Sequence, residues 1–164
     1  FVVMRLSMVF GRKDRRITRL LLVEDEPLVA FEVEHLLIHE NYQIVATVDR
    51  VAQAVAIIRE TQDIDLVLVD VELADGSGVE VARVATEHGI PVLFVTGNFP
   101  SHAEPLASGH LAKPFAQRDL LGAISAIDAA LAGRAPRRLP NGFRLFAQTG
   151  ASGEDRSPLV REGR

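Results

Sequence analysis

Five short apolar runs, each followed by a polar turn, limit what this chain can fold into more than any other feature. The runs have the length and the branched side chains of buried strands, and a helical stripe with apolar residues three and four positions apart follows most of them. The runs cover residues 19–23, 42–48, 66–69, 91–95 and 109–113. This alternation predicts an α/β fold, a doubly wound five-stranded parallel sheet with helices on both faces.

One helix of this fold is expected to be short. The segment Phe99–Ser108 lies where the fourth helix should form, but it contains Pro100 and Pro105. Because a proline inside a helix removes a hydrogen bond and clashes with the preceding turn, we expect at most a turn or two of helix here.

Charge is distributed unevenly along the 164 residues. Residues 17–132 hold 6 basic and 18 acidic side chains, whereas residues 1–16 and 133–164 each carry a net charge of +4. We expect one folded domain over residues 17–132, flanked by disordered extensions at residues 1–16 and 133–164. An acidic body repels phosphate backbones, which argues against DNA as a partner.

The chain contains no cysteine and no apolar run long enough to span a bilayer. We therefore expect a cytoplasmic protein that does not bind membranes.

Polar side chains stand at the ends of four predicted strands: Glu24 and Asp25 after the first, Asp70 after the third, Thr96 after the fourth and Lys113 after the fifth. Each alone could be a helix cap, a turn residue or a surface charge. In a parallel sheet they share one edge, where three carboxylates repel one another unless a cation compensates. Mg²⁺, which prefers oxygen ligands, and a nearby lysine suit phosphoryl transfer, so the residues predict an acyl-phosphate site with Asp70 as the nucleophile.

Four motifs, in this order, carry a resemblance to a known family. They are Leu-Leu-Val-Glu-Asp at 21–25, Leu-Val-Asp-Val-Glu-Leu-Ala-Asp-Gly-Ser-Gly at 68–78, Phe-Val-Thr-Gly at 94–97 and Leu-Ala-Lys-Pro-Phe at 111–115. From about Ile17 to Leu131 the sequence resembles the receiver domain of CheY-like response regulators, which have a flavodoxin-like (βα)5 fold.

The resemblance implies a role for each site residue. Asp70 would accept a phosphoryl group from a kinase phosphohistidine, while Thr96 and Lys113 would contact the phosphoryl oxygens. Asp25, Asp70 and the backbone carbonyl of Glu72 would bind Mg²⁺, with Glu24 acting largely through water. The Lys113–Pro114 peptide bond would be cis.

The resemblance also implies partners. A sensor histidine kinase or a phosphotransfer protein would supply the phosphoryl group, and the protein would signal through contact with an unknown downstream protein or a phosphorylation-dependent homodimer. Residues 134–164 are too short and too polar for a DNA-binding output domain. Self-phosphorylation and self-dephosphorylation would be the only catalysis.

The sequence departs from the family at the switch position three residues before the lysine. His110 stands where Tyr or Phe is usual. It is either a pH-sensitive or hydrogen-bonding substitute that acts as a switch residue together with Thr96, or a half-exposed residue at a strand end. Phe94-x-Thr-Gly together with Phe99 resembles a group of alphaproteobacterial single-domain regulators served by HWE-type kinases. The Glu72 side chain either tunes dephosphorylation or is a surface charge.

Two other functions remain possible from the residues alone. A phosphatase of the haloacid-dehalogenase type also uses Asp, Lys and Mg²⁺, but it places a second aspartate where this chain has Glu72 and needs room for a cap domain. A flavodoxin-like FMN carrier needs a phosphate loop after the first strand, where the acidic residues 24–26 would repel the phosphate.

Overall fold

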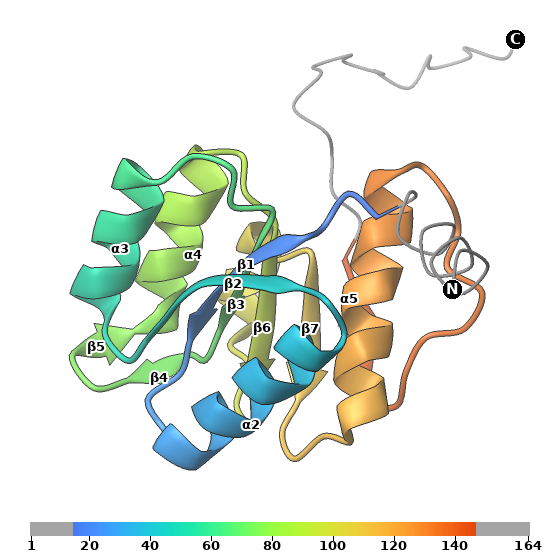
Figure 1. The fold of residues 1–164 in the computed structure, drawn as a ribbon, viewed down its shortest axis with the longest axis horizontal. Coiled ribbons are helices and arrows are strands. Elements are labelled where there is room, and N and C mark those ends of the chain that lie inside the picture. Colours follow the sequence, from blue (N-terminus) through green and yellow to red (C-terminus); the bar gives the residue numbers. More distant parts are fainter. Residues whose placement is uncertain (1–14, 147–164) are drawn as a thin grey trace, which may run out of the picture.

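A central sheet built on five parallel strands organises the computed structural model, which describes residues 15–146 (Figure 1). The sheet order is β2-β1-β3-β6-β7-β8, and the first five strands of that order run parallel. Their bounds are β1 Arg19–Val23, β2 Gln43–Val48, β3 Leu66–Val69, β6 Val92–Thr96 and β7 Gly109–Ala112. The predicted parallel α/β sheet is therefore confirmed.

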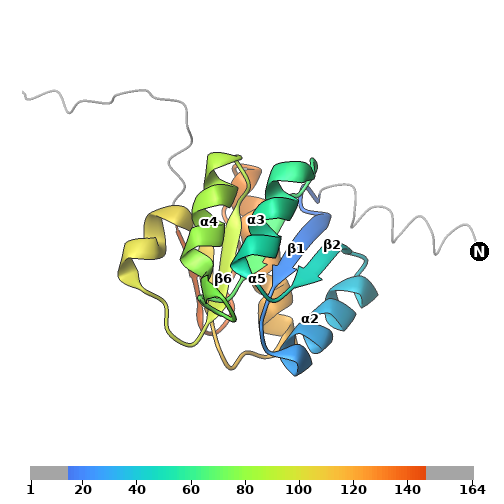
Figure 2. The same ribbon diagram turned by 90° about the vertical axis from the view of Figure 1, so that its left-hand side faces the viewer.

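Helices cover both faces of this sheet (Figures 1 and 2). The bounds are α2 Pro27–His39, α3 Val51–Glu60, α4 Gly78–Glu87 and α5 Gln117–Leu131. One buried cluster joins α2 and α5 to the sheet and contains Leu20 and Leu22, while the other joins α3 and α4 to the opposite face and contains Leu21 and Val23. Successive residues of β1 thus serve both cores, as expected for a strand buried on both sides.

The helix between β6 and β7 is short, as its prolines predict. A 3-10 helix, η1, spans Ser101–Leu106 with Pro105 inside it, and buried Ala103 packs this segment against the sheet. Tight helices of this kind rarely exceed one or two turns.

The C-terminal prediction was wrong for part of its range. Strand β8, Phe143–Leu145, pairs antiparallel with β7 and makes the sheet six-stranded, so residues 133–146 are not a disordered tail. The reason is that isolated aromatic residues, which show no periodicity in the sequence, bury against distant elements: Phe143 and Phe146 are both buried. Residues 147–164, and residues 1–14 of the predicted N-terminal extension, lie outside the described residues.

The N-terminal boundary of the fold is held by α5. The buried carboxylate of Asp128 accepts hydrogen bonds from the backbone N–H groups of Arg16 and Ile17. Across residues 15–146, the structure contains no helix with both the length and the apolar character that a membrane span requires.

Candidate functional site

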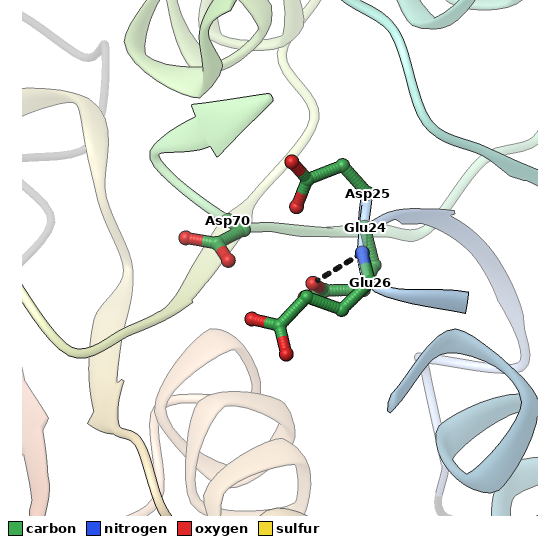
Figure 3. A group of neighbouring side chains, drawn as sticks. All are labelled: Glu24, Asp25, Glu26 and Asp70. Carbon is green, nitrogen blue, oxygen red and sulfur yellow. Dashed lines mark hydrogen bonds between the residues drawn. The ribbon is translucent and has the colours of Figure 1, made fainter. Parts of the chain in front are cut away.

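Glu24, Asp25, Asp70 and Lys113, four of the five polar residues predicted to converge, lie together at the carboxyl edge of the sheet. Glu24, Asp25 and Glu26 follow β1, and Asp70 follows β3 on the neighbouring strand. One carboxylate oxygen of each lies within 4.8 Å of the others, and Figure 3 shows the four side chains around a common space. Glu24 and Asp70 are buried, Asp25 is half-buried and Glu26 is exposed.

Lys113 joins this cluster from the end of β7. Its Nζ donates to Asp70 Oδ2 at 2.8 Å and to Glu24 Oε2 at 2.8 Å, and lies 3.5 Å from Glu26 Oε1. The Lys113–Pro114 peptide bond is cis, which confirms the expectation from the resemblance. The ammonium group therefore supplies positive charge to three carboxylates of the cluster, those of Glu24, Glu26 and Asp70.

Burial and pairing set the protonation of this cluster. Burial alone would lower the pKa of Lys113, but its hydrogen bonds with Asp70 and Glu24 outweigh that effect and hold the pKa above its usual value. Burial raises the pKa of Glu24, and the hydrogen bond from Lys113 offsets this only in part. Lys113 therefore stays protonated. Its charge offsets only part of the cost of burying the ionised Glu24 carboxylate.

The backbone around Asp70 fixes the position of its carboxylate. The Asp70 N–H donates to the Val23 carbonyl, and Asp70 Oδ1 accepts from the Glu72 N–H at 3.3 Å. A Cβ on Gly78 would lie 1.8 Å from the Asp70 carbonyl oxygen, so the glycine lets α4 begin directly against this loop. The Glu72 side chain is exposed and is not part of the carboxylate cluster.

Thr96 ends β6, next to β3 in the sheet, and is buried. Its Oγ1 accepts from the Asn98 N–H at 3.4 Å, and its carbonyl accepts from the Lys113 N–H at 3.2 Å. Its hydroxyl is therefore bound weakly by the loop that follows the strand.

His110 is bonded to Thr96 and stacked on an aromatic neighbour. Its Nε2 donates to the Thr96 carbonyl at 3.1 Å, which places the proton on that nitrogen, because a carbonyl can only accept. The ring stacks on Phe99 with centroids 4.5 Å apart. Burial lowers the pKa of His110, the bond to Thr96 opposes this, and the charge of Arg144 adds to the lowering.

The carboxylate cluster fits a divalent cation of the Mg²⁺ type. Its donors are all oxygens, and three of the four side chains are buried or half-buried. The cation bonded to the cluster is the Lys113 ammonium group. Hard cations prefer such ligands and keep several water molecules.

Two participants were not predicted as site residues. Glu26 belongs to the carboxylate cluster, and its position two residues after Glu24 was the available signal. Phe146 stacks on Phe99 with centroids 5.7 Å apart, and no local pattern in the sequence indicates that contact.

Comparison with known proteins agrees with this geometry. The family model for the response regulator receiver domain matches residues 20–125. The phyllosphere-induced regulator PhyR of Methylorubrum extorquens is 31% identical over 113 residues, which are 66% of this chain and 42% of that protein. The transcriptional regulatory protein PdtaR of Mycobacterium tuberculosis is 30% identical over 65% of this chain and 54% of its own length, so the chain spans about half of these relatives.

A solved structure shows the same fold. The two-component response regulator of the LuxR family from Aurantimonas sp. SI85-9A1 superposes with a TM-score of 0.60 at 30% identity, over 73% of this chain and 88% of that one. Residues 20–125, which the family model matches, contain all four strand ends of the site. The chain therefore belongs to the response regulator receiver domain family of two-component signalling, whose members act with histidine kinases.

Proposed function

We propose that Asp70 receives a phosphoryl group from the phosphohistidine of a sensor histidine kinase or a phosphotransfer protein. The observation that carries the proposal is the 2.8 Å contact between Lys113 Nζ and Asp70 Oδ2 inside a cluster of carboxylates. An Asp nucleophile beside a fixed cation at a strand end is what acyl-phosphate formation needs. The family match favours this function over the phosphatase and FMN-carrier alternatives.

In the transfer, a carboxylate oxygen of Asp70 attacks phosphorus and the phosphorus–nitrogen bond of the phosphohistidine breaks. Lys113 neutralises charge on the phosphoryl oxygens, and the Thr96 hydroxyl donates to one of them. The imidazole leaves with the bonding electron pair, and Asp70 holds an acyl phosphate. Beyond self-phosphorylation and hydrolysis of the acyl phosphate, in which water releases inorganic phosphate and restores the Asp70 carboxylate, we propose no enzymatic activity.

The same cluster would hold Mg²⁺ through Asp25, Asp70 and the Glu72 carbonyl, with Glu24 acting largely through water. The ion supplies charge neutralisation for the phosphoryl oxygens. The weakly compensated Glu24 and the half-buried Asp25 both support this assignment. With Mg²⁺ bound to these oxygens, Lys113 would pair with Asp70 and with the phosphoryl group that Asp70 carries.

The exposed face of α2 supports docking of the phosphoryl donor beside the site. Leu28 and Phe31 are 70% and 63% exposed on this helix, which begins one residue after Glu26. A groove of about 390 Å³ adjoins it, lined by residues of α2 and by Lys113, Pro114 and Phe115. Apolar side chains in such a place suit an amphipathic helix of the donor.

Output would pass through protein contact, with a downstream partner or a second copy of the chain. Phe94, Thr96 and Phe99 support membership in the Phe-x-Thr-Gly group that HWE-type kinases serve. Transfer rates from an HWE-type kinase and from a kinase of another class would test this subgroup. An increase in molar mass on phosphorylation, measured by light scattering, would test the homodimer.

The phosphoacceptor assignment is tested by mass spectrometry of the protein incubated with Mg²⁺ and acetyl phosphate. The wild type should gain one phosphoryl group, and Asp70→Asn should gain none. The matched control is Asp63→Asn, because Asp63 is exposed with φ 68°, a conformation that Asn also tolerates. Full labelling of Asp70→Asn would refute the assignment.

A further inference from the structure

Residues 140–146, which follow α5 and include β8, are here called the strap. They cover the edge of β7, the strand that leads to Lys113. We propose that the strap stays docked on β7 while Asp70 is unphosphorylated and is released when Asp70 carries a phosphoryl group. The proposal rests on the function proposed above. It adds a regulated contact between the phosphorylation site and the C-terminal end of the domain.

The surface under the strap is shaped to receive it. A Cβ on Gly109 of β7 would lie 2.6 Å from the Phe143 ring, and a Cβ on Gly122 of α5 would lie 2.7 Å from Pro140 Cγ. Two glycines on different elements thus make room for two strap residues. Backbone bonds close both ends of the pairing, from the Ala112 N–H to the Gly142 carbonyl and from the Phe146 N–H to the Ser108 carbonyl, each at 2.9 Å.

Figure 1 shows the chain after α5 passing along that helix before it reaches the sheet. Phe143 joins the core shared with α2 and α5, while Phe146 joins the core on the opposite face. The strap therefore contacts both layers of the fold at the edge of the sheet.

Phe146 is held by the loop that follows Thr96. It stacks on Phe99, which also packs against Phe94 with centroids 5.3 Å apart and stacks on His110. Arg144 lies over the Phe146 ring at 5.1 Å and 4.0 Å from Glu104 of η1. The position of Phe99 thus decides whether Phe146 keeps its aromatic partner.

Phe99 is in turn linked to the site through Thr96. The Thr96 hydroxyl accepts from the N–H of Asn98, the residue before Phe99, and the Thr96 carbonyl accepts from His110. When the hydroxyl turns to donate to a phosphoryl oxygen on Asp70, the Asn98 N–H loses its acceptor and the loop shifts. Three ring contacts centred on Phe99 are then broken together, which favours release of Phe146 and the strap.

Release would expose the main-chain edge of β7. An exposed sheet edge is a surface that binds an extended segment of another protein by strand addition. The strap would thus occupy an output surface until phosphorylation frees it.

Hydrogen exchange tests the coupling directly, in the full chain with and without Mg²⁺ and beryllofluoride, a stable mimic of the phosphoryl group. We expect the amides of Ala112 and Phe146 to exchange at least about tenfold faster with beryllofluoride bound. The Gln43 amide, bonded to the Thr18 carbonyl at the far edge of the sheet, is the internal control and should not change.

Fluorine NMR in the same samples reports whether beryllofluoride is bound. Bound beryllofluoride with unchanged exchange at Ala112 and Phe146 would overturn the strap proposal alone. Absence of a bound fluorine signal would overturn the proposed function, and the coupling with it. The two failures are therefore distinguishable.

Linkage gives a reciprocal test. If phosphorylation weakens strap docking, weakening the strap must favour the phosphorylated state by the same factor. Phe146→Ala and Gly122→Ala should bind beryllofluoride about fivefold tighter than the wild type. Leu139→Ala, just before the strap and 44% exposed, is the matched control and should bind as the wild type does. Equal affinity in all four proteins would contradict the coupling.

Discussion

Lys113 and Asp70 are 43 positions apart in the sequence, yet Lys113 Nζ lies 2.8 Å from Asp70 Oδ2. The same nitrogen lies 2.8 Å from Glu24 Oε2, so one cation bridges two buried carboxylates from different strands. The contact links the stability of the fold to the chemistry of the site, because removing the cation leaves both carboxylates buried without compensation.

Lys113→Met, which keeps the length of the side chain without its charge, should lower the free energy of unfolding by about 3 kcal/mol. Mg²⁺ should restore most of that loss, because a divalent cation supplies the missing positive charge. Urea unfolding with and without Mg²⁺ measures both effects. Arg118→Met, at an exposed residue of α5, is the control; an equal loss in both variants would contradict the role of the bridge.

Asp25→Asn should weaken Mg²⁺ binding at least about tenfold, because the affinity of a hard cation depends on the charge of its ligands. Glu32→Gln, at an exposed residue of α2 outside the carboxylate cluster, should leave the affinity unchanged. Isothermal titration with MgCl₂ gives both dissociation constants. Equal affinities for the two variants would show that Asp25 is not a ligand.

His110 should make the fold less stable as the pH falls from about 7 to about 5. Burial lowers the pKa of the folded-state His110 below that of the unfolded chain, so the unfolded state binds the proton first. The stability that neutral His110 contributes is present above the pKa it has in the unfolded chain. It is lost as the pH falls toward the pKa of His110 in the folded protein. The groups facing the ring are the Thr96 carbonyl, the Phe99 ring and the Arg144 guanidinium.

His110→Phe should therefore lose less stability than the wild type over that range, as measured by urea unfolding at each pH. The difference between the two proteins isolates His110 from Glu24, whose raised pKa acts in the opposite direction. His102→Gln, at an exposed residue of η1, is the control. A His110→Phe curve parallel to the wild type would contradict the assignment.

The sheet and its helices could be predicted because their signals are local. Branched apolar runs and stripes such as that of Val51, Ala54 and Ile58 specify each element within a few residues. The sheet topology then brings the site residues together, because the carboxyl ends of all parallel strands lie at one edge of the sheet. These residues are Glu24, Asp25, Asp70 and Lys113.

Strand β8 and its aromatic contacts could not be predicted in this way. Phe143 and Phe146 lie in a polar stretch and are buried against residues distant in the sequence. Phe143 packs where Gly109 has no side chain, and Phe146 stacks on Phe99. His110 shows the same limit: its ring is held by Phe99 and the Thr96 carbonyl, contacts that no spacing along the chain reveals.

Gly78 lies at the start of α4, directly against the backbone of Asp70. A Cβ at this position would lie 1.8 Å from the Asp70 carbonyl oxygen and 2.8 Å from Val69 Cγ2, so either the helix or the loop that carries the nucleophile must move. Gly78→Ala should therefore lower the free energy of unfolding by about 2 kcal/mol and slow labelling of Asp70 by acetyl phosphate. Gly97→Ala is the matched control, because a Cβ there meets nothing within 4 Å, and its unfolding midpoint in urea should stay near that of the wild type. If both alanine variants unfold at the same urea concentration as the wild type, the close approach of α4 to Asp70 is not a constraint on the site.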